Sequence, residues 1–396
     1  MKDRSSSKAK GFVAIVLTSL LIFGLYALAA AETFKIGIIG PLSGPASVWG
    51  QQIVRGAEMA SEEINAKGGF PVGNEKYTIK LIPYDDKYKG PEGLTAANKL
   101  VFDDKVKVIL GSISSASILA FQVVTEPNKV LVLCNSFSHQ VLDTKKPYTF
   151  RILMTSLEKA PLEVGWVAKN KPNIKNAVTW APNDVSGWDV TKHYLKAFKD
   201  NNINVLLSEY YERGTRDFYP ILTRIKAKNP DLLYSCGSPP GDVGLMVKQA
   251  REMGIKCMIM GHAGSVEDPE KFVGIAGKKN AEDYTYGTDF NFESKEPKAV
   301  QFIEKYVKKY SRPCYGYVDP CFYDATMAYA YAAHKAGSLD ADKVQEMLKR
   351  IPEYEGVMGA FKFSGKEDYG TDQQRLTTCF IAQIKDGKQV ILSQVR

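Results

Sequence analysis

Short apolar runs alternate with segments of helical periodicity along most of the chain. Residues 34–39 form an apolar run that ends in Gly and Pro, and Ile53, Ala57, Ala60 and Ile64 then recur at helical spacing. Buried strands that alternate with helices are typical of parallel sheets, whose faces are covered by helices. The pattern therefore predicts an α/β protein.

The same alternation continues to the end of the chain. Further strands are predicted at 78–84, 106–109, 130–133, 177–181, 205–209, 231–236, 256–261, 356–363 and 376–395. Further helices are predicted at 91–103 and 116–121, between the strands of the second half, and over most of 297–350. A hairpin turn is predicted at 385–387, where the sequence is Lys-Asp-Gly.

Two corners rich in serine follow neighbouring predicted strands, at 110–117 and at 134–139. In a β-α-β unit both corners lie at the carboxyl edge of the sheet, where ligands usually bind. Hydroxyl groups, backbone N–H groups and a helix N-terminus together suit an anion. A single corner is equally well explained by helix capping, but two corners one helix apart favour a binding site.

The N-terminus predicts export. Residues 1–10 carry four basic side chains, residues 12–30 are mostly apolar, and an alanine-rich segment precedes Glu32. This order is typical of a secretory signal peptide, so that residues 1–31 are expected to be removed. A permanent membrane anchor is the alternative, because the apolar run is close to spanning length.

Composition limits the remaining possibilities. About 365 residues follow the signal segment, enough for two domains. The formal net charge is +8, but the lysines are scattered and no basic stripe with interleaved aromatic residues occurs, which argues against nucleic-acid binding. Of the six cysteines, Cys236 and Cys257 are expected at opposite edges of one sheet; only Cys314 and Cys321 are placed for a disulfide, which stays open.

Motifs for catalysis and for cofactors are not found. The chain contains no GxGxxG, P-loop, HExxH or GxSxG sequence, and its four histidines are scattered. No CxxC or HxxxH spacing accompanies the cysteines. We therefore expect neither an enzyme nor a metal or cofactor site.

Several motifs carry a resemblance to the leucine/isoleucine/valine-binding protein family. They are Gly-Pro-Leu-Ser-Gly-Pro at 40–45, Gly-Ala-Glu at 56–58, Ile-Asn-Ala-Lys-Gly-Gly at 64–69, Tyr-Asp-Asp at 84–86, Gly-Ser-Pro-Pro-Gly at 237–241, Lys-Gln-Ala-Arg at 248–251 and Val-Met-Gly at 357–359. The chain resembles this family over essentially the whole segment after the signal peptide, with the motifs in the same order.

The resemblance implies a type I periplasmic binding protein, in which two doubly wound parallel-sheet lobes are joined by a three-segment hinge. The implied crossovers lie near Phe150, Gly287 and Phe361. The implied lobes are 32–150 with 288–361, and 151–287 with 362–396. Such a protein captures a small ligand in the periplasm and delivers it to an ABC permease of the inner membrane.

The resemblance also implies ligand-binding residues. In the first lobe these are Trp49, Ser115, Ser136, Phe137 and Ser138. In the second lobe the matching positions hold Ser186, Ser238, Pro239 and Ala263, where the family has two tyrosines and an acid that pairs with the ligand ammonium. Ala263 departs most from the family, because a buried ammonium without a partner costs several kcal/mol.

Several functions remain open at this stage. The ligand is expected to be an amino acid or a related small carboxylate: either an aromatic or branched acid without an amino group, or an amino acid whose ammonium is held by Asp184 or Asp289. A periplasmic sensory protein that feeds a membrane receptor would have the same fold. An exported hydrolase is a weak third hypothesis, since no histidine is placed by the sequence beside Ser115 or Ser138.

Overall fold

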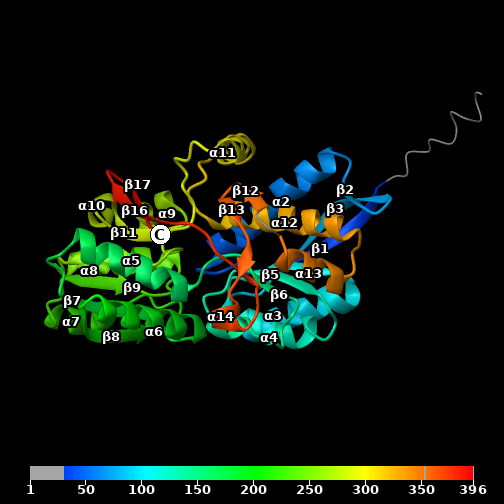
Figure 1. Cartoon of the computed structure of the whole chain (residues 1–396). Coiled ribbons are helices and arrows are strands. Elements are labelled where there is room, and N and C mark those ends of the chain that lie inside the picture. The colour runs from blue at the N-terminus through cyan, green and yellow to red at the C-terminus, as the bar shows by residue number, and fades with distance from the viewer. Residues whose placement is uncertain (1–30, 352–353, 396) are drawn as a thin grey trace, which may run out of the picture.

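The chain forms two lobes, each built around its own β-sheet (Figure 1). The structure is a computed structural model that describes residues 31–351 and 354–395. Blue, cyan and orange elements make up the first lobe, and the second lobe is mostly green and yellow (Figure 1). The predicted α/β class with parallel sheets is confirmed.

The first sheet has the strand order β14-β15-β6-β5-β4-β1-β3-β2. Its strands are β1 (Glu32–Gly40), β2 (Phe70–Val72), β3 (Glu75–Asp85), β4 (Val108–Gly111), β5 (Leu131–Cys134), β6 (Thr149–Arg151), β14 (Phe363–Ser364) and β15 (Gln374–Arg375). Neighbouring strands from β3 to β15 run parallel, while β2 and β14 are antiparallel edge strands.

Helices cover both faces of this sheet. They are α2 (Ser47–Ala66), α3 (Gly90–Asn98), a π-helical turn (Lys99–Asp103), α4 (Ser115–Thr125), a 3-10 turn (His139–Val141), α11 (Pro297–Tyr310), α12 (Val318–Ala336), α13 (Ala341–Lys349) and α14 (Lys366–Tyr369). A small hairpin of β12 (Tyr354–Gly356) and β13 (Gly359–Phe361) stands apart from the sheet.

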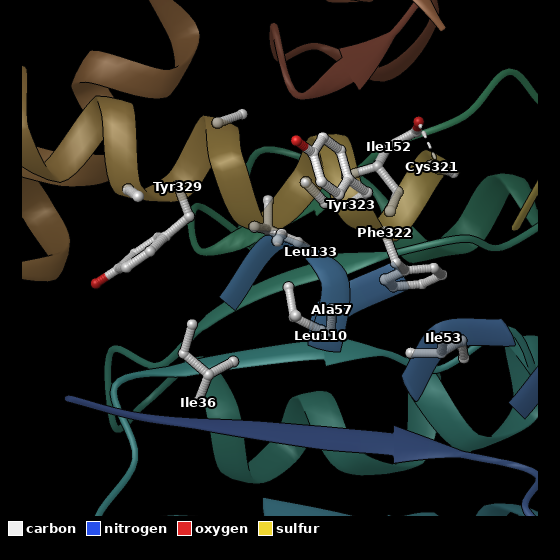
Figure 2. Close-up of a cluster of buried hydrophobic side chains, with 14 of the residues drawn as sticks. Ile36, Ile53, Ala57, Leu110, Leu133, Ile152, Cys321, Phe322, Tyr323 and Tyr329 are labelled. Atoms are coloured by element: carbon white, nitrogen blue, oxygen red, sulfur yellow. Dashed lines mark hydrogen bonds between the residues drawn. The ribbon is translucent and has the colours of Figure 1, made fainter. Parts of the chain in front are cut away.

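The core of the first lobe lies between the sheet and the pair α2 and α12. Figure 2 shows Ala57 of α2 and Phe322 and Tyr329 of α12 above strand side chains such as Leu110. The two helices approach closely at Gly56, where a Cβ atom would lie 2.1 Å from the carbonyl oxygen of Asp319. The helical spacing seen in the sequence thus marks the buried face of α2.

The second sheet has the order β17-β16-β11-β10-β9-β7-β8. Its strands are β7 (Asn176–Pro182), β8 (Asn204–Tyr211), β9 (Leu232–Ser235), β10 (Met258–Gly261), β11 (Thr285–Thr288), β16 (Cys379–Lys385) and β17 (Lys388–Val395). Its helices are α5 (Ser156–Asn170), α6 (Val185–Asp200), α7 (Tyr219–Ala227), α8 (Pro240–Glu252), α9 (Pro269–Ala276) and α10 (Lys278–Ala281). The predicted hairpin turn joins β16 to β17.

The chain passes between the lobes at three places, and one of them differs from the expected position. It leaves the first sheet after β6 and the second sheet after β11, close to the expected Phe150 and Gly287. The third passage was expected near Phe361, but β14 and β15 still pair within the first sheet. The chain therefore crosses between Arg375 and Cys379, and residues 363–375, which the resemblance implied for the second lobe, belong to the first.

Each sheet has one point where the strand order reverses. In the first sheet this point lies between β1 and β4, because β3 continues on one side of β1 and β5 on the other side of β4. In the second sheet it lies between β7 and β9. Ligands of open α/β sheets bind in the crevice at such switch points, beyond the carboxyl ends of the strands.

All six cysteines are free thiols, including Cys314 and Cys321, for which a disulfide was left open. The Cys321 thiol instead donates to the carbonyl oxygen of Ile152 at 3.4 Å, as the dashed line in Figure 2 marks. Within the described residues, none of the helices has both the length and the apolar character that a membrane crossing requires. The predicted signal peptide lies almost wholly outside these residues.

Candidate functional site

The serine-rich corners after β4 and β5 form one hydrogen-bonded cluster. The hydroxyl oxygens of Ser115 and Ser136 are 2.9 Å apart, and both accept from the backbone N–H of Ser138, at 3.3 and 3.1 Å. Ser115 begins α4 and is fully buried, as are Ser136 and Ser138. The two corners thus meet at one edge of the sheet, as the sequence predicts.

The second lobe closes on this cluster. Ser186, in the first turn of α6, donates to the Ser115 hydroxyl at 2.9 Å, and the Ser138 hydroxyl donates to the Asp189 carboxylate at 2.5 Å. The backbone N–H of His139 also reaches Asp189, at 3.2 Å. These bonds join the two switch points, so the structure describes a closed arrangement of the lobes.

Aromatic side chains line the seam between the lobes. The Trp49 ring lies 5.8 Å from that of Tyr88, and the Phe137 ring packs edge-on against His262 at 5.2 Å. Phe137 belongs to the first lobe but is buried in an apolar cluster of the second, whereas Ala263 of the second lobe is buried in the core of the first. Phe137 and Ala263 thus pack reciprocally, each into the apolar core of the other lobe.

Ser238 and Pro239 lie at the corner after β9, just before α8. Both are buried, and the Ser238 hydroxyl has no hydrogen-bond partner among the described residues. The corner is tied to the neighbouring strand, because the backbone N–H of Gly237 donates to Nδ1 of His262 at 3.2 Å. A pocket of about 400 Å³ lies beside this corner, lined by Pro45 and Val48 of one lobe and by Gly241 of the other.

Two ion pairs stand near the seam. Nε of Arg213 donates to Asp184 at 2.5 Å, and its guanidinium carbon lies 4.2 Å from the centre of the Tyr88 ring. Burial works against the charge of Arg213, but Tyr88 and Asp184 leave its pKa above the ordinary value. Behind the cluster, Lys159 of α5 pairs with Asp289 at 2.5 Å with both side chains almost fully buried.

Other titratable groups at the seam are shifted by burial. Burial lowers the pKa of His262 to about 3, so this imidazole is neutral at physiological pH. Burial raises the pKa of Glu267 to about 8. The Glu267 carboxyl belongs to the second lobe but accepts from two first-lobe groups, Nε2 of Gln52 at 3.2 Å and the backbone N–H of Tyr317 at 3.0 Å.

The structure brings the nine sequence-predicted residues to the interface of the lobes, in three groups. The largest group joins Ser115, Ser136, Ser138 and Ser186; Phe137 and Ala263 pack across the seam; Trp49, Ser238 and Pro239 flank it. Sequence reasoning missed Tyr88, Asp189, Arg213, His262 and Glu267. Arg213 had a usable signal, since it stands just after the carboxyl end of β8, as the serine corners stand after the carboxyl ends of β4 and β5 in the other sheet.

Comparison with known proteins identifies the family. Residues 33–389 match the family described as periplasmic binding protein. The chain belongs to the periplasmic binding protein family. The match spans both lobes and all three crossings, so the closed interface described above is the interface between the two lobes of a periplasmic binding protein.

Relatives and solved structures extend this result. The chain is 28% identical over 370 residues to a leucine-, isoleucine-, valine-, threonine- and alanine-binding protein of Pseudomonas aeruginosa, covering 93% of this chain and 94% of that protein. Its fold matches that of a leucine-binding protein of Thermotoga maritima, with a TM-score of 0.82 at 22% identity, over 92% of this chain and 99% of the other. The fold also matches that of an ABC-transporter solute-binding protein of Rhodopseudomonas palustris BisB5, whose structure is a complex with 3,4-dihydroxybenzoic acid. The TM-score is 0.79 at 22% identity, and the match covers 91% of this chain and 97% of the other.

The geometry gives no support to the hydrolase hypothesis. Within the described part of the chain, neither Ser115 nor Ser138 is hydrogen-bonded to a histidine side chain. The Ser138 hydroxyl donates to the Asp189 carboxylate, so it lacks the histidine partner of a Ser–His nucleophile. The same residues contain no group of three or more His, Cys, Asp or Glu side chains arranged to hold a metal ion.

Proposed function

We propose that this periplasmic binding protein is exported, captures an amino acid or a related small carboxylate between its lobes, and delivers it to an ABC permease. The observation that carries the proposal is the bond from Ser186 to Ser115, because it joins the switch points of both sheets. A ligand held between the two sheets at these switch points touches both lobes and therefore favours the closed state. The nine predicted residues are proposed to surround the ligand at the interface of the lobes.

A carboxylate without an amino group is the second candidate, and specific contacts favour it. The two acids that the sequence suggests as replacements for the counter-ion missing at Ala263 are already paired: Asp184 with Arg213, and Asp289 with Lys159. Glu267 remains, but burial holds its pKa at about 8, so much of it is protonated at neutral pH. The complex of the related R. palustris protein with 3,4-dihydroxybenzoic acid agrees with such a ligand class.

A thermal-shift panel tests both candidates. Leucine, valine and phenylalanine are compared with 4-methylpentanoate, 3-methylbutanoate and 3-phenylpropanoate, which lack the amino group, and with benzoate. A ligand at about 100 times its dissociation constant adds about 2.7 kcal/mol to the stability of the folded protein, enough to raise the melting temperature by several degrees. Shifts by the acids alone support the second candidate.

The amino-acid candidate is supported if leucine, valine or phenylalanine raises the melting temperature and the corresponding acids without an amino group do not. A panel that shifts nothing contradicts the proposed ligand class as a whole. Mass spectrometry of small molecules released from the purified protein provides an independent check. A sensory role is distinguished by deleting a co-purifying permease, since loss of uptake supports transport and an intact uptake rate supports sensing.

A further inference from the structure

Arg213 reaches across the seam from the second lobe to the first. It lies in the loop after β8, and its guanidinium packs over the ring of Tyr88, in the loop after β3. Its side chain as a whole is 21% exposed, but both terminal nitrogens, Nη1 and Nη2, are buried. Neither of them has a hydrogen-bond partner among residues 31–351 and 354–395.

The position of the guanidinium is fixed by its other contacts. Nε donates to Asp184, and Asp184 is itself held as the N-cap of α6 by the backbone N–H of Gly187 at 2.9 Å. Tyr88 covers one face of the guanidinium, and Trp49 packs against Tyr88. The edge formed by Nη1 and Nη2 is therefore presented in one orientation at an aromatic-walled part of the seam.

That edge has the geometry of a carboxylate receptor. A guanidinium offers parallel N–H groups that match the two oxygens of a carboxylate, and such paired, charge-assisted bonds are among the strongest hydrogen bonds in proteins. Buried N–H groups of a cation without acceptors are costly. A small carboxylate between the lobes would give both nitrogens their acceptors.

The serine cluster is less available for the same task. The Ser138 hydroxyl donates to Asp189, and its backbone N–H is bonded to Ser115 and Ser136. The hydroxyls of Ser115 and Ser136 bond each other, and Ser115 also accepts from Ser186. In the closed arrangement these groups satisfy one another, whereas Arg213 keeps free donors.

We infer that Arg213 binds the carboxylate of the ligand through Nη1 and Nη2, in place of the serine cluster. This inference rests on the proposed function, the capture of a small carboxylate, and adds the group that recognises it. Asp184 and Tyr88 are positioning residues for the guanidinium. The serine cluster then serves to join the lobes.

The test compares acids with their amides in wild-type protein and in Arg213→Gln. The probes are benzoate with benzamide, leucine with leucinamide, and 3-phenylpropanoate with its amide, measured by calorimetry. We expect Arg213→Gln to weaken binding of the acid about 100-fold, as loss of paired charged bonds predicts, and to leave the amide within a few-fold. The preference for acid over amide then falls by the same factor.

Two further variants separate recognition from structure. Arg213→Lys keeps the charge but loses the parallel N–H groups, so we expect an intermediate loss for the acid, and this variant carries the test if Arg213→Gln does not fold. Arg224→Gln is the matched control, because Arg224 is a second-lobe arginine that pairs with Glu209 on the surface. We expect it to leave every affinity unchanged.

The outcomes distinguish two kinds of failure. If the wild-type protein binds an acid and both Arg213 variants keep its preference for acid over amide, the Arg213 inference is overturned while the proposed function stands. If Arg213→Gln weakens acid and amide equally, the residue is structural and the inference is likewise overturned. If the wild-type protein binds none of the acids, the proposed function fails and the inference with it.

Discussion

Two ion pairs lie at the interface of the lobes, one buried and one partly exposed, and they differ in how completely their hydrogen bonds are satisfied. Lys159 and Asp289 are 1% and 0% exposed; the ammonium also lies over the rings of Phe137 and Tyr317, and the carboxylate accepts from Thr377 at 3.2 Å. Arg213 and Asp184 are 21% and 29% exposed, and Nη1 and Nη2 of the arginine have no acceptor among the described residues.

The difference follows from where the partners stand in the chain. Asp289 comes directly after β11, where the chain leaves the second sheet, and Thr377 lies in the crossing before β16. Lys159 on α5 thus ties two of the crossings together. Arg213 and Tyr88, by contrast, lie on loops at the facing edges of the two sheets. The Lys159–Asp289 pair, whose hydrogen bonds are satisfied, suits a structural role at the hinge. The Arg213–Asp184 pair, which leaves two donors without acceptors, suits ligand binding.

The largest expected effect comes from breaking the hinge pair. Lys159→Met leaves the Asp289 carboxylate buried without its cation, which typically costs 3–5 kcal/mol. We expect the free energy of unfolding, measured with urea, to fall by about that amount. Arg213→Gln should cost no more than about 1 kcal/mol, because its pair is partly exposed.

The double variant Lys159→Met with Asp289→Asn serves as the control for this prediction. Removing both charges relieves the buried, uncompensated carboxylate, so most of the lost stability should return. If Arg213→Gln destabilises the unliganded protein as much as Lys159→Met does, the two pairs have the same role and the comparison fails.

The sequence predicted the parts of the fold that local pattern encodes. Long apolar runs such as β1 and the helical spacing of α2 were recognised because each contains its own evidence. The strands β14 and β15 have only two residues each, and their place in the first sheet depends on pairing with β6, more than 200 residues earlier. Such long-range pairing has no local signature, so the residue pattern could not correct the third crossing that the resemblance implied.

In the candidate site, too, the sequence predicted what depends on local pattern and missed the contacts that depend on long-range packing. The serine corners were identified because each directly follows a strand, and the chain order alone brings them to one edge. Tyr88 and Arg213 are 125 positions apart, and their contact exists only through the closure of the lobes. The sequence also could not predict that Asp184 pairs with Arg213 and Asp289 with Lys159. These pairings decide whether either acid is available to pair with a ligand ammonium.

A second prediction concerns the serine cluster. Ser138→Ala removes the bond to the Asp189 carboxylate, and a hydrogen bond to a charged group contributes about 1.5–3 kcal/mol. Because this bond joins the lobes, its loss should weaken ligand binding by about 10- to 150-fold while leaving the unfolding of the unliganded protein nearly unchanged.

Asp189 provides the matched test of this mechanism. If Ser138 acts by joining the lobes, Asp189→Asn should weaken binding in the same direction, and the double variant should lose no more than the stronger single variant. An additive double variant, or an unchanged dissociation constant in Ser138→Ala, would show that the bond between Ser138 and Asp189 does not stabilise the closed state.

The smallest expected effect concerns pH, through Glu267. Burial and, second to it, the charge of Asp319 in the opposite lobe raise the pKa of this carboxyl to about 8, against the bonds from Gln52 and Tyr317 that lower it. Because these groups belong to the first lobe, we attribute the raised pKa to the closed arrangement. In an open protein these groups move away, and we expect the pKa of the carboxyl to return toward its ordinary value of 4.5. Between these values closure takes up a proton, because the open state has released it and the closed state holds it. Affinity for an acid without an amino group should therefore fall as pH rises, by up to about tenfold between about pH 6.5 and 7.5.

Glu267→Gln mimics the protonated carboxyl and should remove this slope, whereas Glu270→Gln, on the exposed first turn of α9, should keep it. Calorimetry in one buffer series across this range provides the measurement. The direction of this pH dependence also shows whether Glu267 is the counter-ion of a ligand ammonium. If the ligand carries an ammonium that rests on ionised Glu267, binding requires the carboxylate, affinity should rise with pH, and Glu267→Gln should weaken binding throughout. That result would show that Glu267 replaces the acid missing at Ala263, and that the protein selects an amino acid after all.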